Sequence, residues 1–227
     1  MGLLPMEADI LPPSDDRVFK LILTSSEAKQ ALMNLISCVI GRTVVDVVLL
    51  PNELAPGDTE EKAERFDVNC KIDDGSQVNL EMQASYMVED LDGQHRNLKG
   101  KSVYYLTDLH SSQPAKGLRR YDRLARSYQI TFCSYTIFPN TQDYVNSFSM
   151  RHNVTGELLS DAISVTFVEL SKLGEVVKKP VSDMTALDKW SVFFQYAPDL
   201  EHREIVNKVI ESDELLQLAG NLLMSIS

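Results

Sequence analysis

The stretch ERFDVNCKIDDGSQVNLEMQ, residues 64–83, decides the fold. Apolar and polar residues alternate with a period of two on either side of the segment Asp-Asp-Gly at 73–75. This period is typical of strands that have one apolar and one polar face. Gly75 suits the left-handed position that closes a three-residue turn. The sequence therefore predicts a β-hairpin.

The turn also fixes the pairing of the two arms. If Ile72 faces Ser76, Val78 lies beside Cys70, and Asp67 lies opposite Glu81. Directly opposed side chains have Cβ atoms roughly 5 Å apart, which is close enough for two carboxylates to share one metal ion. The apolar residues of the two arms face one another in the same register.

Composition is that of a globular protein, but its charge is unevenly spread. The 227 residues are 44% hydrophobic, enough for one domain with a sizeable core, and the net charge of −11 argues against a protein that coats nucleic acid nonspecifically. Residues 94–126 hold eight basic and two acidic side chains, 8 − 2 = +6. This segment is either a solvated helix face or a local phosphate-binding patch.

Three widely separated cysteines exclude a CxxC-type metal site, and their odd, sparse count suggests a reducing compartment. No apolar run is long enough to span a membrane, and the N-terminus lacks the order of a signal peptide. We therefore expect a cytoplasmic protein with no membrane association.

The order of elements predicts an α/β fold around a mixed sheet. Ser14 or Asp15 would cap a first helix, and Ser25 or Ser26 a second that ends at Gly41. A β-branched run then predicts a strand, in which Asp46 needs a partner or an edge position. After the hairpin come a long helix with Val103, Leu106 and Leu109 inward and its basic residues outward, and a strand. The expected ranges of the strand, the long helix and the second strand are 43–50, 88–113 and 128–138.

The last third of the chain predicts two strands and then helices. Strands at about 142–152 and 161–170 either extend the sheet or form a separate hairpin. An aromatic-rich helix at 185–196 and an acidic helix or helix pair at 199–224 follow. We expect three units, namely an N-terminal arm, a nuclease-like core and a C-terminal extension packed on that core, with ranges 1–14, 15–140 and 141–227.

Facing carboxylates repel each other unless a cation lies between them, and a hard divalent ion such as Mg²⁺ is bound by such oxygen ligands. Gln83 lies two residues beyond Glu81 and projects from the same face, where its amide could orient a water or a phosphate oxygen. On pattern alone, a solvent-exposed polar hairpin face is the favoured interpretation.

Several motifs in order resemble the bacterial PD-(D/E)XK nuclease family transposases, a group that includes recombination-promoting nucleases. The likeness covers roughly residues 14–140, and its segments are DDRVFKLIL, RFDV, VNLEMQ, SVYYLTDLHSSQ, KGLRRYDRL and SYQITFCSYTIF. It implies a restriction-endonuclease-like mixed β-sheet core (αβββαβ) flanked by helices, with extra C-terminal strands and helices. It also implies a metal-dependent endonuclease that hydrolyses the phosphodiester bonds of DNA with Mg²⁺ or Mn²⁺.

The resemblance assigns Asp67 and Glu81 as metal ligands and Gln83 as a third catalytic residue, where most of the superfamily has lysine. Phe66 replaces the proline of the superfamily's name, which carries no chemistry. A nearby lysine could supply the missing positive charge, and the candidates are Lys71, Lys99 and Lys101.

Further site residues are secondary. Asp16 and Glu27 could add a carboxylate to the metal site, although helix capping explains both equally well. Arg96 and Tyr104, eight residues apart, could share one helix face towards the substrate, although a packed tyrosine and a surface arginine are commoner. The expected contacts to DNA phosphates are Lys99, Lys101, Arg119 and Arg120.

Two other functions compete with a nuclease. A catalytically weak or inactive descendant of the same fold could serve as a DNA-binding or protein-interaction module. A two-carboxylate hydrolase acting on sugars ranks low, because no aromatic cluster lies near the hairpin. A homodimer is expected only by analogy with nucleases that cut two strands.

Overall fold

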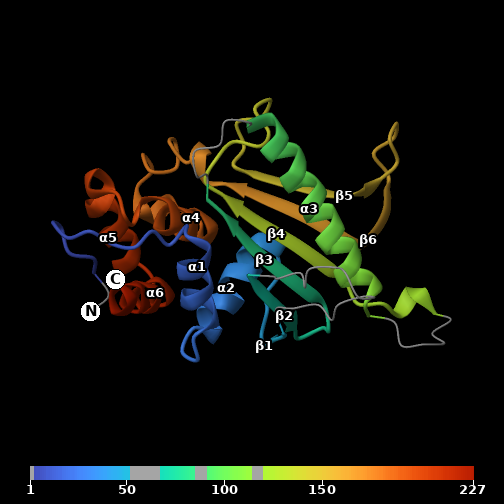
Figure 1. Cartoon of the computed structure of the whole chain (residues 1–227), viewed down its shortest axis with the longest axis horizontal. Coiled ribbons are helices and arrows are strands. Elements are labelled where there is room, and N and C mark those ends of the chain that lie inside the picture. The colour runs from blue at the N-terminus through green and yellow to red at the C-terminus, as the bar shows by residue number, and fades with distance from the viewer. Residues whose placement is uncertain (1–2, 52–66, 85–90, 114–119) are drawn as a thin grey trace.

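The computed structural model describes residues 3–51, 67–84, 91–113 and 120–227, with only the backbone for 91–96. The helices and strands are α1 (Asp16–Thr24), α2 (Lys29–Ile40), β1 (Val47–Leu49), β2 (Val68–Ile72), β3 (Gln77–Gln83), α3 (Leu91–Ser111), β4 (Ser127–Cys133), β5 (Val145–Arg151), β6 (Leu158–Glu169), α4 (Ala186–Tyr196), α5 (Arg203–Glu211) and α6 (Glu214–Ile226) (Figure 1).

Strands β2 and β3 form the predicted hairpin. The N–H of Ile72 donates to the carbonyl of Ser76 over 2.9 Å, and Gly75 has φ +87°, the left-handed conformation that the turn needs. Cys70 pairs with Val78, so the register is the predicted one. Phe66 lies outside the described residues.

The hairpin belongs to a six-stranded mixed sheet of order β1-β2-β3-β4-β6-β5. β3, β4 and β6 run parallel to one another, whereas β1, β2 and β5 are antiparallel to their neighbours. The two C-terminal strands extend the sheet and form no separate hairpin. This is the predicted α/β architecture, a restriction-endonuclease-like core with added strands and helices.

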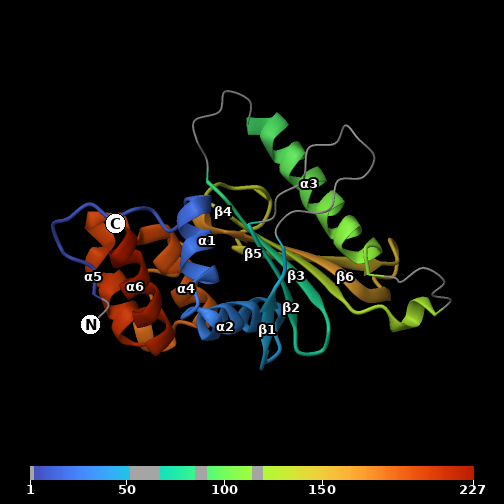
Figure 2. The same ribbon diagram turned by 60° about the horizontal axis from the view of Figure 1, so that its bottom comes forward.

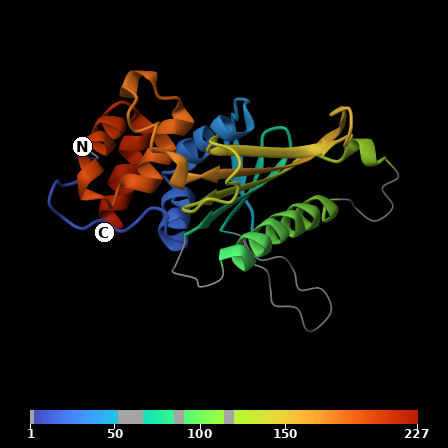
Figure 3. The same ribbon diagram turned by 90° about the horizontal axis from the view of Figure 1, so that it is seen from above.

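The two faces of the sheet are covered differently. Figures 2 and 3 show α3 crossing one face alone, while α1, α2 and the C-terminal helices lie on the other side. The apolar face of the hairpin joins Phe19 of α1 and Phe194 of α4 in the larger core. A smaller core lies on the α3 side, around Leu98, Leu106 and Phe167.

Several predicted boundaries and orientations are wrong for local reasons. The second helix begins at Lys29, with Ala28 rather than a serine at its N-cap and no side-chain cap. The first strand is only three residues long. The N–H of Val45 donates to the Asp73 carboxylate and not to a neighbouring strand, and the side chain of Asp46 forms an ion pair with Lys29. Val103, expected inward, is 55% exposed.

Strand β4 ends at Cys133, five residues before the predicted end. The buried carboxylate of Glu169 accepts hydrogen bonds from the N–H groups of Ile137 and Phe138 and an ion pair from Lys172 at 2.5 Å. These main-chain donors therefore bond to a side chain and leave the strand ladder.

The N-terminal arm packs on the C-terminal helices. Arg203 of α5 is fully buried and donates to the carbonyls of Pro5 and Ala8, while Asn207 exchanges two hydrogen bonds with the backbone of Leu4. The three-unit division at residues 14 and 140 remains a proposal. Across the ranges described, no helix is both long and apolar enough to cross a membrane.

Candidate active site

Asp67 and Glu81 meet where β2 begins and β3 nears its end. The main-chain N–H of Asp67 donates to Oε1 of Glu81 over 3.4 Å. The Asp67 carboxylate reaches across the hairpin in return, and its Oδ2 accepts from the N–H of Met82 at 2.9 Å. Hairpin register and these two hydrogen bonds hold the two acidic residues together.

Besides the N–H of Asp67, three side-chain donors surround the Glu81 carboxylate, which is only 2% exposed. Lys101 comes from α3 and places its Nζ 2.7 Å from Oε2, and Gln83 approaches the same oxygen at 3.5 Å. Asn79 donates to Oε1 over 3.2 Å. A buried carboxylate needs such partners, because an uncompensated charge is costly to bury.

The charges of the site shift its titration. Burial and the neighbouring charge of Glu81 raise the pKa of Asp67 to about 7, against 3.8 ordinarily. Burial alone would lower the pKa of Lys101, but the adjacent Glu81 carboxylate raises it on balance. Asp67 is thus an acid with an incompletely compensated charge, and Lys101 is a firmly protonated cation.

The polar face of the hairpin is buried beneath α3, so the expectation that it faces solvent is wrong. Asn79 donates to Oε1 of Gln129 at 2.8 Å, and Gln129 donates to Thr131 at 3.2 Å. The hydroxyl of Thr131 lies 3.4 Å from that of Ser102 on α3. This connected layer explains why Lys101 points inward, although the basic residues of this helix were expected to face outward.

The sequence did not single out Asn79 and Gln129 as site residues. Each lies two residues before another polar residue of the same strand, Glu81 and Thr131, and so on the same face. This spacing was the available signal. It could not show which helix would cover the face.

The secondary candidates lie in different places. Asp16, the first residue of α1, is close enough for its charge to contribute to the raised pKa of Asp67. Glu27 is exposed in the turn before α2 and has no described contact with the hairpin carboxylates. Tyr104 is half exposed and its ring lies 6.3 Å from that of Tyr105. The side chain of Arg96 lies outside the described residues.

The predicted phosphate contacts that the structure describes already have partners within the protein, including Lys101, which pairs with Glu81. Lys99 lies over the ring of Phe138, with 4.6 Å from Nζ to the centroid. Arg120 forms a two-pronged pair with Asp122, and Arg119 lies outside the described residues. Lys71 lies opposite Gln77 in the strand pairing, beside the turn and at the other end of β2 from Asp67. This position excludes Lys71 as the lysine of this site.

The donor set suits a hard divalent ion. Asp67 and Glu81 supply carboxylate oxygens, which Mg²⁺ prefers, and a cation between them would relieve the repulsion that raises the pKa of Asp67. Near these two carboxylates, the side-chain oxygen Oδ1 of Asn79 is buried and accepts no hydrogen bond from the described residues. Among the described residues no group of three or more His, Cys, Asp or Glu gathers, so a bound ion would take its remaining ligands from water or substrate.

Comparison with known proteins gives one match. The model of the PD-(D/E)XK nuclease family transposases matches residues 13–225, nearly the whole chain. The match includes both hairpin carboxylates, helix α3 and all six strands. No curated protein and no solved structure matches the chain.

Proposed function

Because the chain belongs to the PD-(D/E)XK nuclease family transposases, we propose that it is a Mg²⁺- or Mn²⁺-dependent endonuclease that hydrolyses phosphodiester bonds in DNA. Nucleases of this type generally use divalent metals, and the family implies a DNA substrate. The observation that carries the proposal is the pair of Asp67 and Glu81 with the Lys101 ammonium 2.7 Å from Glu81.

In this proposal, Asp67 and Glu81 hold the ion. The bound ion supplies charge stabilisation for the phosphodiester and lowers the pKa of a water. Asp67 must lose its proton to act as a ligand, and its pKa of about 7 allows this at neutral pH. Asp16 lies at the margin of the site, where its carboxylate adds negative charge.

Lys101 would supply the positive charge that most of the superfamily takes from the strand. Gln83 lacks a charge, but its amide and the Lys101 ammonium approach the same oxygen of Glu81. A lysine from α3 therefore fills the place next to the second carboxylate. Its role would be to neutralise charge that develops on the phosphate oxygens, while Gln83 orients the attacking water.

Plasmid cleavage tests this function. Wild-type protein should nick or linearise duplex DNA in Mg²⁺ or Mn²⁺ and stop when the metal is chelated. Asp67→Ala should abolish cleavage, whereas Asp183→Asn, an exposed acid in the turn before α4, should cleave like wild type. Cleavage by Asp67→Ala at the wild-type rate would show that the assignment is wrong.

The rival function is an inactive module, and one observation favours it. Lys101 forms an ion pair with Glu81 at 2.7 Å, and a descendant that had lost its ion would need such a compensating cation. Such a module would shift duplex DNA in a gel without cutting it in either metal, and Asp67→Ala would bind DNA as wild type does.

A further inference from the structure

Strand β5 leaves an open edge on the sheet. It is last in the strand order, and in the part of the chain that the structure describes it pairs only with β6. The carbonyl of Tyr144 accepts from the N–H of Glu169 at 2.7 Å. Because such bonds alternate along an antiparallel strand, Val145, Ser147 and Ser149 direct their main-chain groups away from β6.

The first five residues of this edge lack the usual protection against pairing, whereas its far end has a register shift between Ser149 and Arg151. Residues 145–149 contain no charge and no proline, the two devices that commonly blunt edge strands. Phe148 at the centre is 47% exposed, although its ring lies 5.1 Å from Phe138 in an aromatic cluster. An apolar groove of about 270 Å³ runs beside it, lined by Val103 and Val165.

The charges at the two ends of the edge indicate what pairs with it. Asp143 precedes β5 and Arg151 ends it, and both are exposed. Neither has a described salt bridge, although the Arg151 guanidinium donates to Oγ of Ser149 at 3.1 Å and to the carbonyl of Gly156 at 3.0 Å. If a second copy pairs antiparallel, Arg151 of each copy lies near Asp143 of the other copy. A parallel arrangement would oppose like charges.

We propose that two copies of this chain associate through β5, antiparallel and around a two-fold axis at Phe148. Ser147 then lies opposite Ser149 of the second copy, with the outward main-chain groups of both strands bonded to each other. Phe148 faces its own counterpart on the α3 side, and such aromatic pairs stabilise adjacent strands. The two sheets become one.

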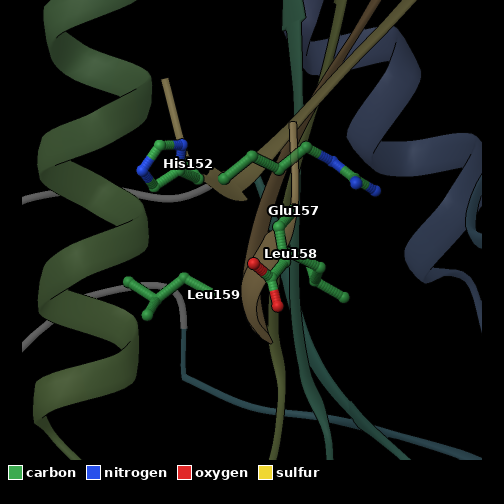
Figure 4. A pocket seen from close by; sticks show the side chains of 5 residues that line it. His152, Glu157, Leu158 and Leu159 are labelled. Carbon is green, nitrogen blue, oxygen red and sulfur yellow. The ribbon is translucent and has the colours of Figure 1, made fainter. Parts of the chain in front are cut away.

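The end of the β5–β6 hairpin exposes apolar side chains close to the proposed interface. Figure 4 shows the side chains of Leu158, Leu159, His152 and Glu157 at this end of the hairpin. They line a hollow of about 360 Å³. Leu159 is 74% exposed. Leu158 lies opposite Arg151 on β6, one strand in from the open edge, so these leucines flank the proposed interface.

The dimer has a consequence for the proposed nuclease, and this step alone rests on that function. Where the two β5 strands meet, a two-fold axis normal to the joined sheet puts both α3 faces on the same side. From one β3 to the other are seven strand spacings of about 4.8 Å, or about 34 Å. This is roughly one helical turn of duplex DNA. The spacing between the two proposed sites would therefore match one turn of a duplex.

Sedimentation of the full-length protein, without metal or DNA, tests the dimer. Wild type should move towards twice the 25.5 kDa chain mass as its concentration rises. Ser147→Pro should stay monomeric, because it removes an outward N–H while leaving the β6 ladder intact. Arg151→Asp should weaken association roughly tenfold, because it opposes two acids at each end.

The charge swap separates pairing from misfolding. Asp143→Arg combined with Arg151→Asp should restore the wild-type affinity, which a misfolded protein cannot do. A wild-type protein of single-chain mass at every concentration would overturn the proposal. A double variant that stays as weak as Arg151→Asp would overturn it too. Either result leaves the nuclease proposal untouched, because cleavage is measured separately.

Discussion

Lys101 reaches down from helix α3 to place its Nζ 2.7 Å from Oε2 of Glu81, beneath the helix that covers the hairpin. A cation from a neighbouring element thus occupies the position next to the second carboxylate. Gln83, on the strand itself, lies 3.5 Å from the same oxygen. The site therefore has its positive charge, from α3 and not from β3.

Removing that charge should slow cleavage without unfolding the protein. Lys101→Met keeps the length of the side chain, and we expect the cleavage rate to fall about 100-fold, as for loss of one charge-stabilising donor. Lys99→Met, two residues away on the same helix, should weaken DNA binding only. Single-turnover cleavage of a labelled duplex separates the two effects.

Returning a lysine to the strand should rescue the loss. Gln83→Lys in the Lys101→Met protein places an ammonium within reach of the same Glu81 oxygen, so part of the cleavage rate should return. If Lys101→Met cleaves like wild type, or if Gln83→Lys restores nothing while the protein stays folded, Lys101 does not have this role.

The raised pKa of Asp67 predicts how stability depends on pH in the absence of metal. An acid with a folded-state pKa of about 7, against 3.8 unfolded, favours the protonated form on folding. Its contribution to the free energy of unfolding is therefore fully present below pH 3.8, and this contribution is lost as the pH rises to 7. Asp67→Asn should then be more stable than wild type at pH 8, by at most about 4 kcal/mol.

Thermal unfolding across this pH range, in a chelator, measures the effect. The gain in melting temperature of Asp67→Asn should shrink towards zero as pH falls to 4, while Asp183→Asn follows wild type throughout. A difference that is constant with pH, or a less stable Asp67→Asn at pH 8, contradicts the raised pKa.

Asn79 should position Glu81 through the buried polar layer. Asn79→Ala leaves the Oε1 atoms of both Glu81 and Gln129 without this donor, and we expect a loss of about 1–3 kcal/mol in unfolding free energy. Mn²⁺ affinity should fall as well, which a purely structural role would not require. Asn153→Ala, at the exposed hairpin end, is the matched control and should change neither quantity.

Arg203 should hold the N-terminal arm in place. Arg203→Met removes the donors to the carbonyls of Pro5 and Ala8 and leaves these acceptors unpaired, with an expected loss of about 2–4 kcal/mol. Limited proteolysis should then cut within the first residues earlier than in wild type. Lys208→Met, exposed on the same helix, should leave the arm protected; equal cleavage in both variants would contradict the clamp.

The hairpin could be predicted from sequence because its signals are local. Alternation and a glycine turn determine the pairing of Cys70 with Val78 without reference to the rest of the chain. The predicted N-cap of the second helix is wrong for a local reason too. Ala28 takes the N-cap position, and Ser25 and Ser26 lie in the preceding turn.

The direction of Lys101 could not be read from sequence, because it depends on a long-range contact. A basic residue on a helix normally faces water, and only the polar layer of Asn79, Gln129 and Thr131 makes an inward lysine favourable. Asp67 and Glu81, in contrast, follow from the hairpin register alone. Their role in catalysis remains a prediction.

Calorimetric titration with Mn²⁺ tests the central claim, that Asp67 and Glu81 together form a divalent-metal site. Wild type should bind the ion, with affinity falling below pH 7 as Asp67 is protonated. Asp67→Asn and Glu81→Gln should each bind at least about tenfold more weakly, while the exposed control Glu201→Gln binds as wild type does. Equal affinity in Glu81→Gln and wild type, or no binding by wild type at pH 8, would contradict the account.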